Sequence, residues 1–217
     1  MEQGSDLIGY RVAKALLGRP LLWAYDIRVE GSDNLPSGPA ILAPNHRSFM
    51  DSLFLALAMD RPVTFLAKAE YFDKRRTAWM FRSTGQIPLR RGSPSGARQA
   101  LHAAGDVLLS GGVVGIYPEG TRSRDGLLHK GRLGPARLAV ATGAPIVPVG
   151  LIGTEQVQTP QQRIPRLGKR IVVHFGQPRW GQQSSGRGLR ELTDQVMADI
   201  SGLCGQVYSG RFAPVPS

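Results

Sequence analysis

A histidine and an aspartate, His46 and Asp51, stand close together with four residues between them, directly after an apolar stretch. A histidine titrates near neutral pH, so it can take a proton from an alcohol, and a carboxylate that holds its ring stabilises the imidazolium that forms. Residues five positions apart diverge by about 140° around a regular helix, so the two side chains cannot meet from within one helix. They can meet at a junction where a strand ends before His46, Ser48 caps a helix and Asp51 falls in its first turn. These residues predict a general base with its orienting carboxylate.

Asp51 also has a purely structural interpretation. Ser48 and Asp51 have the spacing of a capping box, and the apolar residues Leu53 and Phe54 follow them. In that motif the acidic side chain binds a backbone N–H at the start of the helix and has no part in catalysis. Both interpretations remain open from this segment alone.

A second polar segment, residues 118–123, follows the apolar stretch of residues 113–116 and contains Gly120, Thr121 and Arg122. Open α/β sheets place ligand sites at the carboxyl ends of their strands. Glycine lets the backbone approach a ligand closely, a hydroxyl can donate to a phosphate, and a guanidinium can contact two phosphate oxygens at once. The segment therefore predicts a phosphate-binding loop. The structural alternative is a polar turn with an exposed arginine.

Basic residues end two other predicted strands. Lys68 ends one of them, and Arg90 and Arg91 end the short strand of residues 85–91. Because Arg91 and Arg122 both follow strands, we expect them to converge on one end of the sheet, and we count Arg91 and Lys68 as candidate substrate-binding residues. The alternatives are that the arginines discourage pairing at a sheet edge and that Lys68 is solvated.

Strands and helices alternate along the sequence, which is typical of an α/β domain. Strands are predicted over residues 27–30, 39–43, 63–67, 85–91, 113–116, 145–151 and 170–175. Helices are predicted over residues 5–24, 49–59, 74–82, 94–109, 134–142 and 189–203. We therefore expect an α/β fold, a single domain with a central, largely parallel mixed sheet flanked by helices, preceded by an N-terminal helical segment.

The domain organisation follows from length and pattern. A chain of 217 residues can fill one domain with a full core, which we place at residues 25–208. Residues 1–24 are equally compatible with an anchor at a membrane surface and with a helix packed on the core, since Pro20 interrupts their apolar arc. Residues 209–217 are predicted to be a mobile tail.

The formal net charge of +11 indicates a polyanionic partner, either an anionic membrane surface, a phosphorylated substrate or a nucleic acid. A nucleic-acid binder usually interleaves aromatic and basic residues or carries a helix-turn-helix or zinc-finger pattern, and the sequence has neither, so we expect no nucleic-acid partner. No run of 18 apolar residues occurs, so no transmembrane span is predicted. The acidic Glu2 and Asp6 disfavour a secretory signal peptide.

Cysteine and histidine usage disfavours a metal or disulfide protein. Cys204 is the single cysteine, which excludes an intramolecular disulfide and fits a reducing compartment. The histidines His46, His102, His129 and His174 lack the spacing of metal ligands. We expect no metal.

Four segments, taken together and in order, resemble the glycerolipid acyltransferases related to 1-acylglycerol-3-phosphate acyltransferase. Residues 45–51 resemble the first motif of that family, with its histidine and aspartate, and residues 85–91 resemble the second. Residues 117–123, with the sequence Tyr-Pro-Glu-Gly-Thr-Arg-Ser, resemble the third, and residues 144–149 the fourth. The resemblance covers residues 25–180, and the combination is far more specific than any one motif.

The resemblance implies transfer of an acyl chain from the thioester of coenzyme A or acyl carrier protein to the 2-hydroxyl of lysophosphatidate, giving phosphatidate, with no further cofactor. It implies that His46 is the general base and that Asp51 orients it. It also implies that the acceptor's phosphate binds at Arg91, Glu119, Gly120, Thr121 and Arg122. A carboxylate is a poor ligand for phosphate, so from its own chemistry Glu119 is expected to hold an arginine or a loop amide.

Two departures leave the acceptor open. Arg90 stands where many relatives carry an acidic residue, and the sequence lacks the hydrophobic N-terminal hairpin with which some relatives enter the bilayer. Another lysolipid or a glycolipid acceptor, and a non-catalytic basic adaptor for anionic lipid or nucleic acid, remain as alternatives. We expect peripheral attachment to an anionic membrane surface on its cytoplasmic face.

Overall fold

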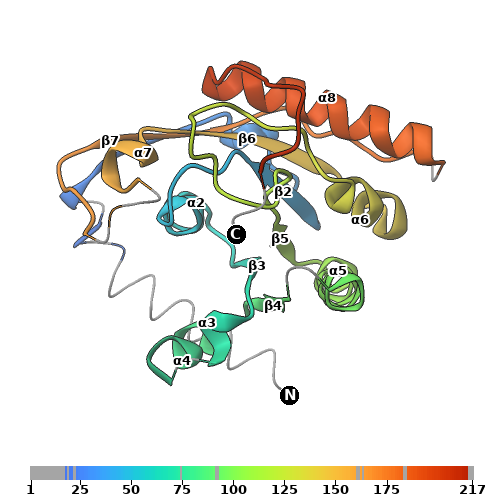
Figure 1. Cartoon of the computed structure of the whole chain (residues 1–217), viewed down its shortest axis with the longest axis horizontal. Helices are drawn as coiled ribbons and strands as arrows, with labels where there is room; N and C mark the ends of the chain where they lie inside the picture. The colour runs from blue at the N-terminus through green and yellow to red at the C-terminus, as the bar shows by residue number, and fades with distance from the viewer. Residues whose placement is uncertain are drawn as a thin grey trace.

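A seven-stranded sheet forms the centre of the molecule in the computed structural model (Figure 1). The structure describes residues 18, 20, 21, 23–73, 75–90, 93–159, 162, 164–182 and 185–214. The strands are β1 (Asp26–Glu30), β2 (Ala40–Pro44), β3 (Val63–Lys68), β4 (Ile87–Leu89), β5 (Val113–Gly115), β6 (Ile146–Ile152) and β7 (Arg170–Phe175). Their order in the sheet is β1-β7-β6-β2-β5-β3-β4.

The sheet is mixed and largely parallel, which confirms the predicted fold class. β6, β2, β5, β3 and β4 run parallel to one another, β7 is antiparallel to β6, and β1 is parallel to β7. The carboxyl ends of the five parallel strands therefore lie along one edge of the sheet. His46 follows β2, Lys68 ends β3 and the loop after β5 carries residues 117–123, so three of the predicted segments meet at this edge, where α/β sheets bind ligands.

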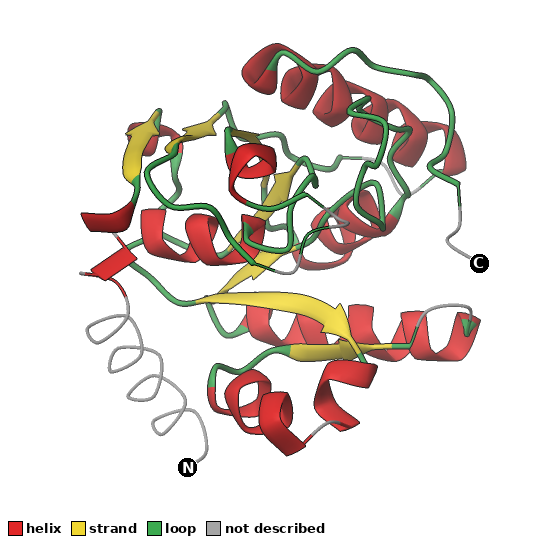
Figure 2. Ribbon diagram, turned by 60° about the vertical axis from the view of Figure 1, so that its left-hand side comes forward, coloured by secondary structure: helices red, strands yellow, loops and turns green. Residues whose placement is uncertain are grey.

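Helices cover both faces of the sheet, and Figure 2 shows the strands between them. The helices are α2 (Asp51–Ala58), α3 (Glu70–Asp73), α4 (Arg75–Ser83), α5 (Pro94–Leu109), α6 (Gly134–Thr142), α7 (Thr154–Val157) and α8 (Gly186–Cys204), and η1 (Ser32–Asn34) is a short 3₁₀ turn. In Figure 1, α8 lies along one side of the molecule, and α3 and α4 lie at the opposite side.

Alternate residues of β2 enter different cores, which explains why this strand is continuously apolar. Ala40 and Leu42 belong to the cluster that contains Phe54 of α2. Ile41 and Ala43 belong to the cluster formed with α5, α6 and α8. Successive side chains of a strand point to opposite faces, so a strand covered on both faces loses the usual polar alternation. β2 is thereby fixed on both sides just before it delivers His46.

The chain after Tyr208, predicted to be a mobile tail, contacts the domain through its backbone. The N–H of Ser209 donates to the carbonyl of Leu128 at 2.8 Å, and the N–H of Lys130 donates to the carbonyl of Arg211 at 2.8 Å. Ala213 is buried. These contacts of residues 209–214 could not be predicted, because backbone bonds to a distant loop leave no periodic pattern in the sequence; residues 215–217 lie outside the described residues.

Most of the predicted N-terminal helical segment also lies outside the described residues. Leu21 and Ala24 pack against the core cluster on the α2 side, whereas Trp23 is almost fully exposed. Within the part of the chain that the structure describes, no helix combines the length and apolar character needed to cross a membrane.

Candidate active site

Asn45 fixes the point at which the chain leaves the sheet. Its side-chain Nδ2 donates to the carbonyl of Leu151 at 3.0 Å, and its Oδ1 accepts from the N–H of the same residue at 2.7 Å. Nδ2 also donates to Oε1 of Gln206 at 2.6 Å, and Nε2 of Gln206 donates to the carbonyl of Gly126 at 2.8 Å. The buried Asn45 side chain thus replaces a strand partner for β6, and the direction of the next residue, His46, is determined.

His46 and Asp51 form the predicted pair. Nδ1 of His46 lies 2.8 Å from Oδ2 of Asp51, whose side chain is 0% exposed. The backbone N–H groups of Arg47 and Ser48 also donate to Oδ2, each at 2.8 Å. A proton on Nδ1 satisfies the carboxylate and leaves Nε2 as the nitrogen that can accept a proton. Bonds from three directions hold the carboxylate, so the ring orientation is fixed as well.

The other oxygen of Asp51, Oδ1, is buried and has no hydrogen-bond partner among the described residues. A buried oxygen without a partner leaves part of the carboxylate charge uncompensated. The ring of His46 bonds to the other oxygen, Oδ2, and is the nearest group that could carry a compensating positive charge.

The helix that carries Asp51 begins later than predicted. α2 starts at Asp51 itself, with Met50 at the preceding position and no side-chain cap. Ser48 Oγ accepts from the N–H of Met50 at 3.1 Å, so Ser48 closes a short turn in front of the helix. The carboxylate of Asp51 nevertheless accepts from the N–H of Ser48, as in a capping box. The same oxygen, Oδ2, thus makes both the capping contact with Ser48 and the contact with His46 that the catalytic interpretation requires.

Tyr117, whose role no sequence pattern indicates, covers the imidazole. Its ring stacks on that of His46 with centroids 3.8 Å apart and planes inclined by 19°. Its hydroxyl lies 2.7 Å from Oγ of Ser52 in α2. Burial raises the pKa of Tyr117 well above its usual value, and the nearby Asp51 charge raises it further. Tyr117 is therefore a neutral wall of the site that limits rotation of the His46 ring.

Glu119 is buried behind the pair, with 1% of its surface exposed. Oε1 accepts from the N–H of His46 at 3.1 Å, and Oε2 accepts from the N–H of His129 at 2.9 Å. Burial raises its pKa to about 7, although the two amide bonds act in the opposite direction. The carboxylate thus joins the His46 loop to the segment before α6, which is the loop-amide role expected from its chemistry.

Thr121 and Arg122 lie in the same loop, half-buried, after Gly120. Gly120 has φ +74°, and a side chain there would collide with Arg132. Beyond it, the N–H of Ser123 donates to the carbonyl of His46 at 2.7 Å, so both Glu119 and Ser123 bond to His46. Within the described part of the chain no acidic side chain lies at ion-pair distance from Arg122, which leaves its charge available to an anion.

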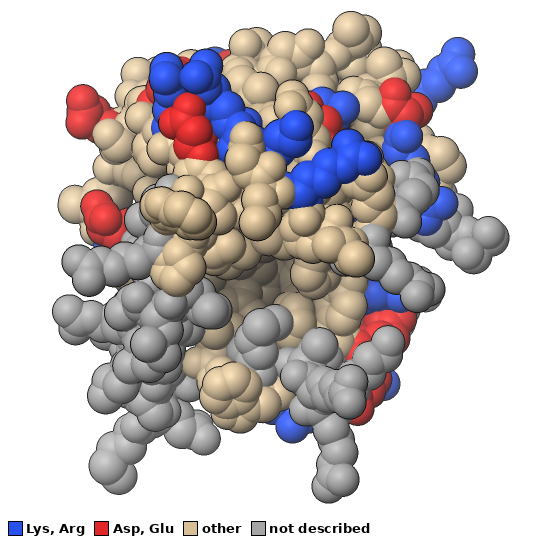
Figure 3. Space-filling model, turned by 90° about the vertical axis from the view of Figure 1, so that its left-hand side faces the viewer, with Lys and Arg blue, Asp and Glu red and all other residues tan. Residues whose placement is uncertain are grey.

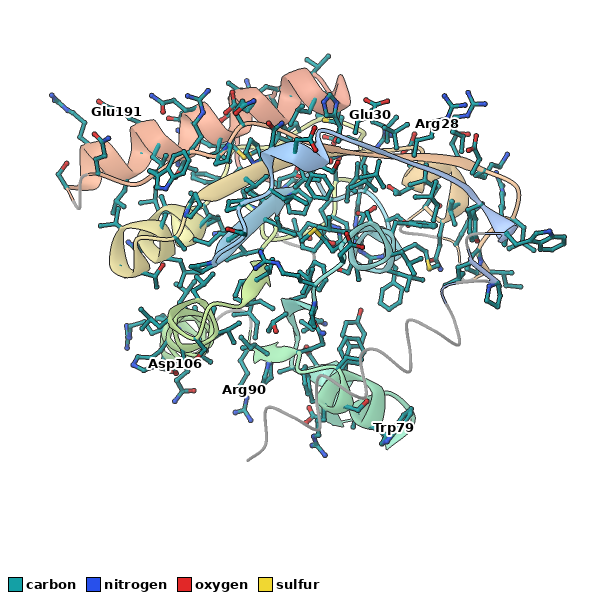
Figure 4. The ribbon with its side chains drawn as sticks, turned by 180° about the vertical axis from the view of Figure 1, so that it is seen from behind. Arg28, Glu30, Trp79, Arg90, Asp106 and Glu191 are labelled. Carbon is teal, nitrogen blue, oxygen red and sulfur yellow. The ribbon has the colours of Figure 1, made fainter. Side chains whose placement is uncertain are left out.

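The remaining predicted residues lie at the same edge of the sheet or outside the described residues. Lys68 is 43% exposed and pairs with Glu70 at 3.0 Å. Arg91 lies outside the described residues. Its neighbour Arg90 is exposed after β4, and Figure 4 shows its side chain pointing outward on the side of the molecule that holds α4 and α5. Among the described residues, no group of three or more histidine, cysteine or acidic side chains could hold a metal ion.

The surface that corresponds to the left-hand side of Figure 1 is hollowed. Figure 3 shows this hollow, with Lys and Arg side chains gathered above it. A concave surface beside a concentration of positive charge is suited to an anionic ligand.

Comparison with known proteins agrees with the fold and with the segments that form the site. The Acyltransferase family model matches residues 26–152. A chloroplastic 1-acyl-sn-glycerol-3-phosphate acyltransferase of Arabidopsis thaliana is 34% identical over 164 residues, covering 70% of this chain and 46% of that protein. A 1-acyl-sn-glycerol-3-phosphate acyltransferase of Pseudomonas aeruginosa is 31% identical over 126 residues, covering 58% of this chain and 48% of that protein. The chain spans about half the length of the curated relatives it matches.

A crystal structure gives the same result for the fold. The 1-acyl-sn-glycerophosphate acyltransferase PlsC from Thermotoga maritima superposes with a TM-score of 0.71 and 28% sequence identity, covering 89% of this chain and 79% of that one. The family match runs through every strand from β1 to β6 and includes both the pair of His46 with Asp51 and the loop of residues 117–123. By its sequence, its fold and the residues at the carboxyl edge of its sheet, the chain belongs to the Acyltransferase family.

Proposed function

We propose that the protein transfers an acyl chain from a thioester, carried by coenzyme A or acyl carrier protein, to the 2-hydroxyl of lysophosphatidate, giving phosphatidate. The observation that carries the proposal is the 2.8 Å bond from Nδ1 of His46 to the buried Asp51, because it makes Nε2 the basic nitrogen. The relatives named as 1-acyl-sn-glycerol-3-phosphate acyltransferases support lysophosphatidate as the acceptor.

In the reaction, Nε2 of His46 accepts the hydroxyl proton while the hydroxyl oxygen attacks the thioester carbonyl. The carbon–sulfur bond then breaks, and the departing thiolate takes the proton from the imidazolium, which returns the histidine to its starting form. Asp51 stabilises the imidazolium between these steps, and the stack of Tyr117 on the ring keeps Nε2 aimed at the acceptor. A positioned general base accelerates such a step by about 10² to 10⁴.

No covalent acyl-enzyme is required in this scheme. Cys204 lies at the end of α8, and burial raises the pKa of its thiol, so the thiolate form is disfavoured. A nucleophilic cysteine needs the opposite shift. Direct attack by the acceptor hydroxyl fits the site better.

Arg122 and Thr121 are proposed to hold the acceptor's phosphate together with Arg91, with Lys68 at the margin. Arg122 is half-buried and has no acidic partner among the described residues, whereas Lys68 is exposed and already paired with Glu70. A charge-assisted bond to phosphate is stronger where a side chain is partly desolvated and not already neutralised. Arg122 is therefore assigned the larger contribution.

We also propose that the protein attaches peripherally to an anionic membrane, on the cytoplasmic face. The net charge of +11 and the basic side chains above the hollow in Figure 3 support this proposal. Binding to vesicles that contain anionic lipid should fall as salt rises, because exposed charges are screened over about 10 Å at 0.1 M salt. Equal binding to neutral and anionic vesicles at every salt concentration would contradict it.

The acyl-transfer proposal is tested by measuring thiol release from acyl-CoA and acyl carrier protein thioesters with lysophosphatidate as acceptor. A panel of other lysolipids and a glycolipid acceptor is run in parallel. We expect the fastest release with lysophosphatidate. Faster thiol release with another acceptor would show that the protein catalyses acyl transfer to that lipid instead of lysophosphatidate. Tight lipid binding without any thiol release would favour the non-catalytic adaptor.

A further inference from the structure

Two cations and an aromatic ring from distant parts of the chain gather beside the Gly120 turn. Nζ of Lys130 lies 5.6 Å from the centre of the Phe212 ring, and the guanidinium carbon of Arg132 lies 5.8 Å from it. Phe212 is 52% exposed, although it is a large apolar residue. Both cations lie within the range of a cation–π contact with this ring.

Backbone bonds set this group against the loop that carries the site. The N–H of Arg132 donates to the carbonyl of Pro118 at 2.8 Å, and the N–H of Lys130 donates to the carbonyl of Arg211 at 2.8 Å. Just before them in the chain, the N–H of His129 donates to Glu119, which also holds His46. Residues 129–132 therefore cannot shift without moving the loop behind the catalytic pair.

The Arg132 side chain lies directly across Gly120. A Cβ on Gly120 would lie 2.8 Å from Nε of Arg132 and 3.0 Å from its Cδ. The glycine is needed here both for its positive φ and for this close approach. The guanidinium is therefore held against the turn that precedes Thr121 and Arg122.

The chemistry of the group indicates an anion site. Within the described part of the chain, neither Lys130 nor Arg132 forms an ion pair, and the guanidinium of Arg132 donates no hydrogen bond. A ring face steadies a guanidinium but accepts none of its five in-plane N–H bonds. Positive charge that is positioned, uncompensated and supplied with free donors is the requirement for binding a phosphate.

We propose that Arg132, seated on Phe212 with Lys130 beside it, is an additional phosphate-binding residue of the acyl-transfer site and acts together with Arg122 on a phosphomonoester dianion. This inference rests on the proposed function. When coenzyme A is the donor, both substrates of that reaction carry such a group, namely the phosphate of lysophosphatidate and the 3′-phosphate of coenzyme A. The site is proposed to bind a phosphomonoester in either case, and the experiment distinguishes lysophosphatidate from coenzyme A as its source.

The test compares Arg132→Ala, Arg132→Lys and Phe212→Leu with Arg137→Ala, which removes an exposed cation from α6 outside this group. Steady-state KM values are measured for lysophosphatidate and for the phosphate-free monoacylglycerol, and for acyl-CoA and acyl-dephospho-CoA. We expect Arg132→Ala to raise KM about tenfold or more for one phosphate-bearing substrate and to leave its phosphate-free counterpart unchanged. Phe212→Leu should produce a smaller rise, and Arg137→Ala none.

The substrate whose KM rises identifies the source of the phosphate. Unchanged KM values for both phosphate-bearing substrates in Arg132→Ala would overturn the proposal, and so would an equal rise in Arg137→Ala. Arg132→Lys keeps the charge but loses the planar fork, so a partial rise supports bidentate contact.

A second measurement keeps this inference separate from the proposed function. Glycerol 3-phosphate and coenzyme A are titrated against the wild-type protein and Arg132→Ala, and the unfolding temperature is recorded. A ligand that binds the folded state raises that temperature. A rise in the wild-type protein that is lost in Arg132→Ala supports the phosphate site even if no acyl transfer is found, and equal rises in both proteins overturn it.

Discussion

The carboxylate of Glu119 accepts the backbone N–H of His46 at 3.1 Å while its second oxygen accepts the N–H of His129. One buried acidic side chain therefore fixes both the catalytic loop and the segment that leads to Arg132. This geometry explains why an acidic residue stands in a loop proposed to bind phosphate. Glu119 supports the loop from behind, and the proposed phosphate ligand would meet the cations around it.

Glu119 should make the stability of the protein depend on pH near neutrality. Its pKa is raised from 4.5 to about 7 in the folded protein, so between these values the folded state binds more protons than the unfolded state. The free energy of unfolding should therefore fall as pH rises through this window, by about 3 kcal/mol relative to a protein without the carboxyl group. Urea unfolding of the wild-type protein and of Glu119→Gln, measured from pH 4 to pH 8, tests this. Parallel pH profiles for the two proteins would exclude it.

Tyr117 should act on turnover through its ring more than through its hydroxyl. Tyr117→Phe keeps the stack on His46 and loses one hydrogen bond to Ser52, which costs about 1 kcal/mol of stability and changes kcat by less than about threefold. Tyr117→Leu removes the flat wall, so the imidazole gains rotational freedom and kcat should fall about tenfold or more at nearly constant KM. Thiol-release kinetics of the two variants decide the point. Equal kcat values in Tyr117→Leu and the wild-type protein would show that the stack has no catalytic role.

Arg122 and Lys68 should differ strongly in their effect on the acceptor. A charge-assisted hydrogen bond contributes about 1.5 to 3 kcal/mol, so Arg122→Ala should raise KM for lysophosphatidate by one to two orders of magnitude. Lys68 is exposed and paired with Glu70, so Lys68→Ala should raise that KM by less than about threefold. Steady-state kinetics with lysophosphatidate and acyl-CoA varied in turn measure both effects. If Arg122→Ala instead weakens only the donor, the arginine binds the phosphates of coenzyme A.

The sequence was sufficient where local patterns carry the information. The apolar stretches of β2, β5 and β6 predict buried strands of a parallel sheet, and in such a sheet His46 and the loop of residues 117–123 must share the carboxyl edge. The spacing of His46 and Asp51 requires a junction between strand and helix, which the structure contains. Ser48 was assigned to the wrong position because a serine can close a turn and cap a helix equally well.

Long-range contacts could not be predicted in the same way. Gln206 binds Asn45 across 161 positions of sequence, and Phe212 meets Lys130 and Arg132 from a segment expected to be mobile. Such contacts have no period and no fixed spacing. Tyr117 stands next to a motif, but only the fold shows that its ring lies on that of His46. One signal was present: Gly120 allows a close approach, and the group that approaches is Arg132.

The general base itself is tested by His46→Ala. This variant should keep its fold and its affinity for the thioester donor, because the side chain lies at the edge of the core, while kcat falls by about 10² to 10⁴ or more. Circular dichroism and donor binding serve as controls. Near-normal turnover in this variant would refute the mechanism.

The most direct test of the pair is kcat of Asp51→Asn. An asparagine can still accept the backbone N–H groups of Arg47 and Ser48, so the turn before α2 should persist at a cost of about 1 kcal/mol. Because Nδ1 of His46 bonds to the same position, that of Oδ2, the amide oxygen there would accept from it as well but carries no charge, so it stabilises the imidazolium far less. We expect a folded protein whose kcat is lower by up to about 10⁴. A folded Asp51→Asn protein with near wild-type kcat would show that Asp51 only caps the helix and that His46 works without it.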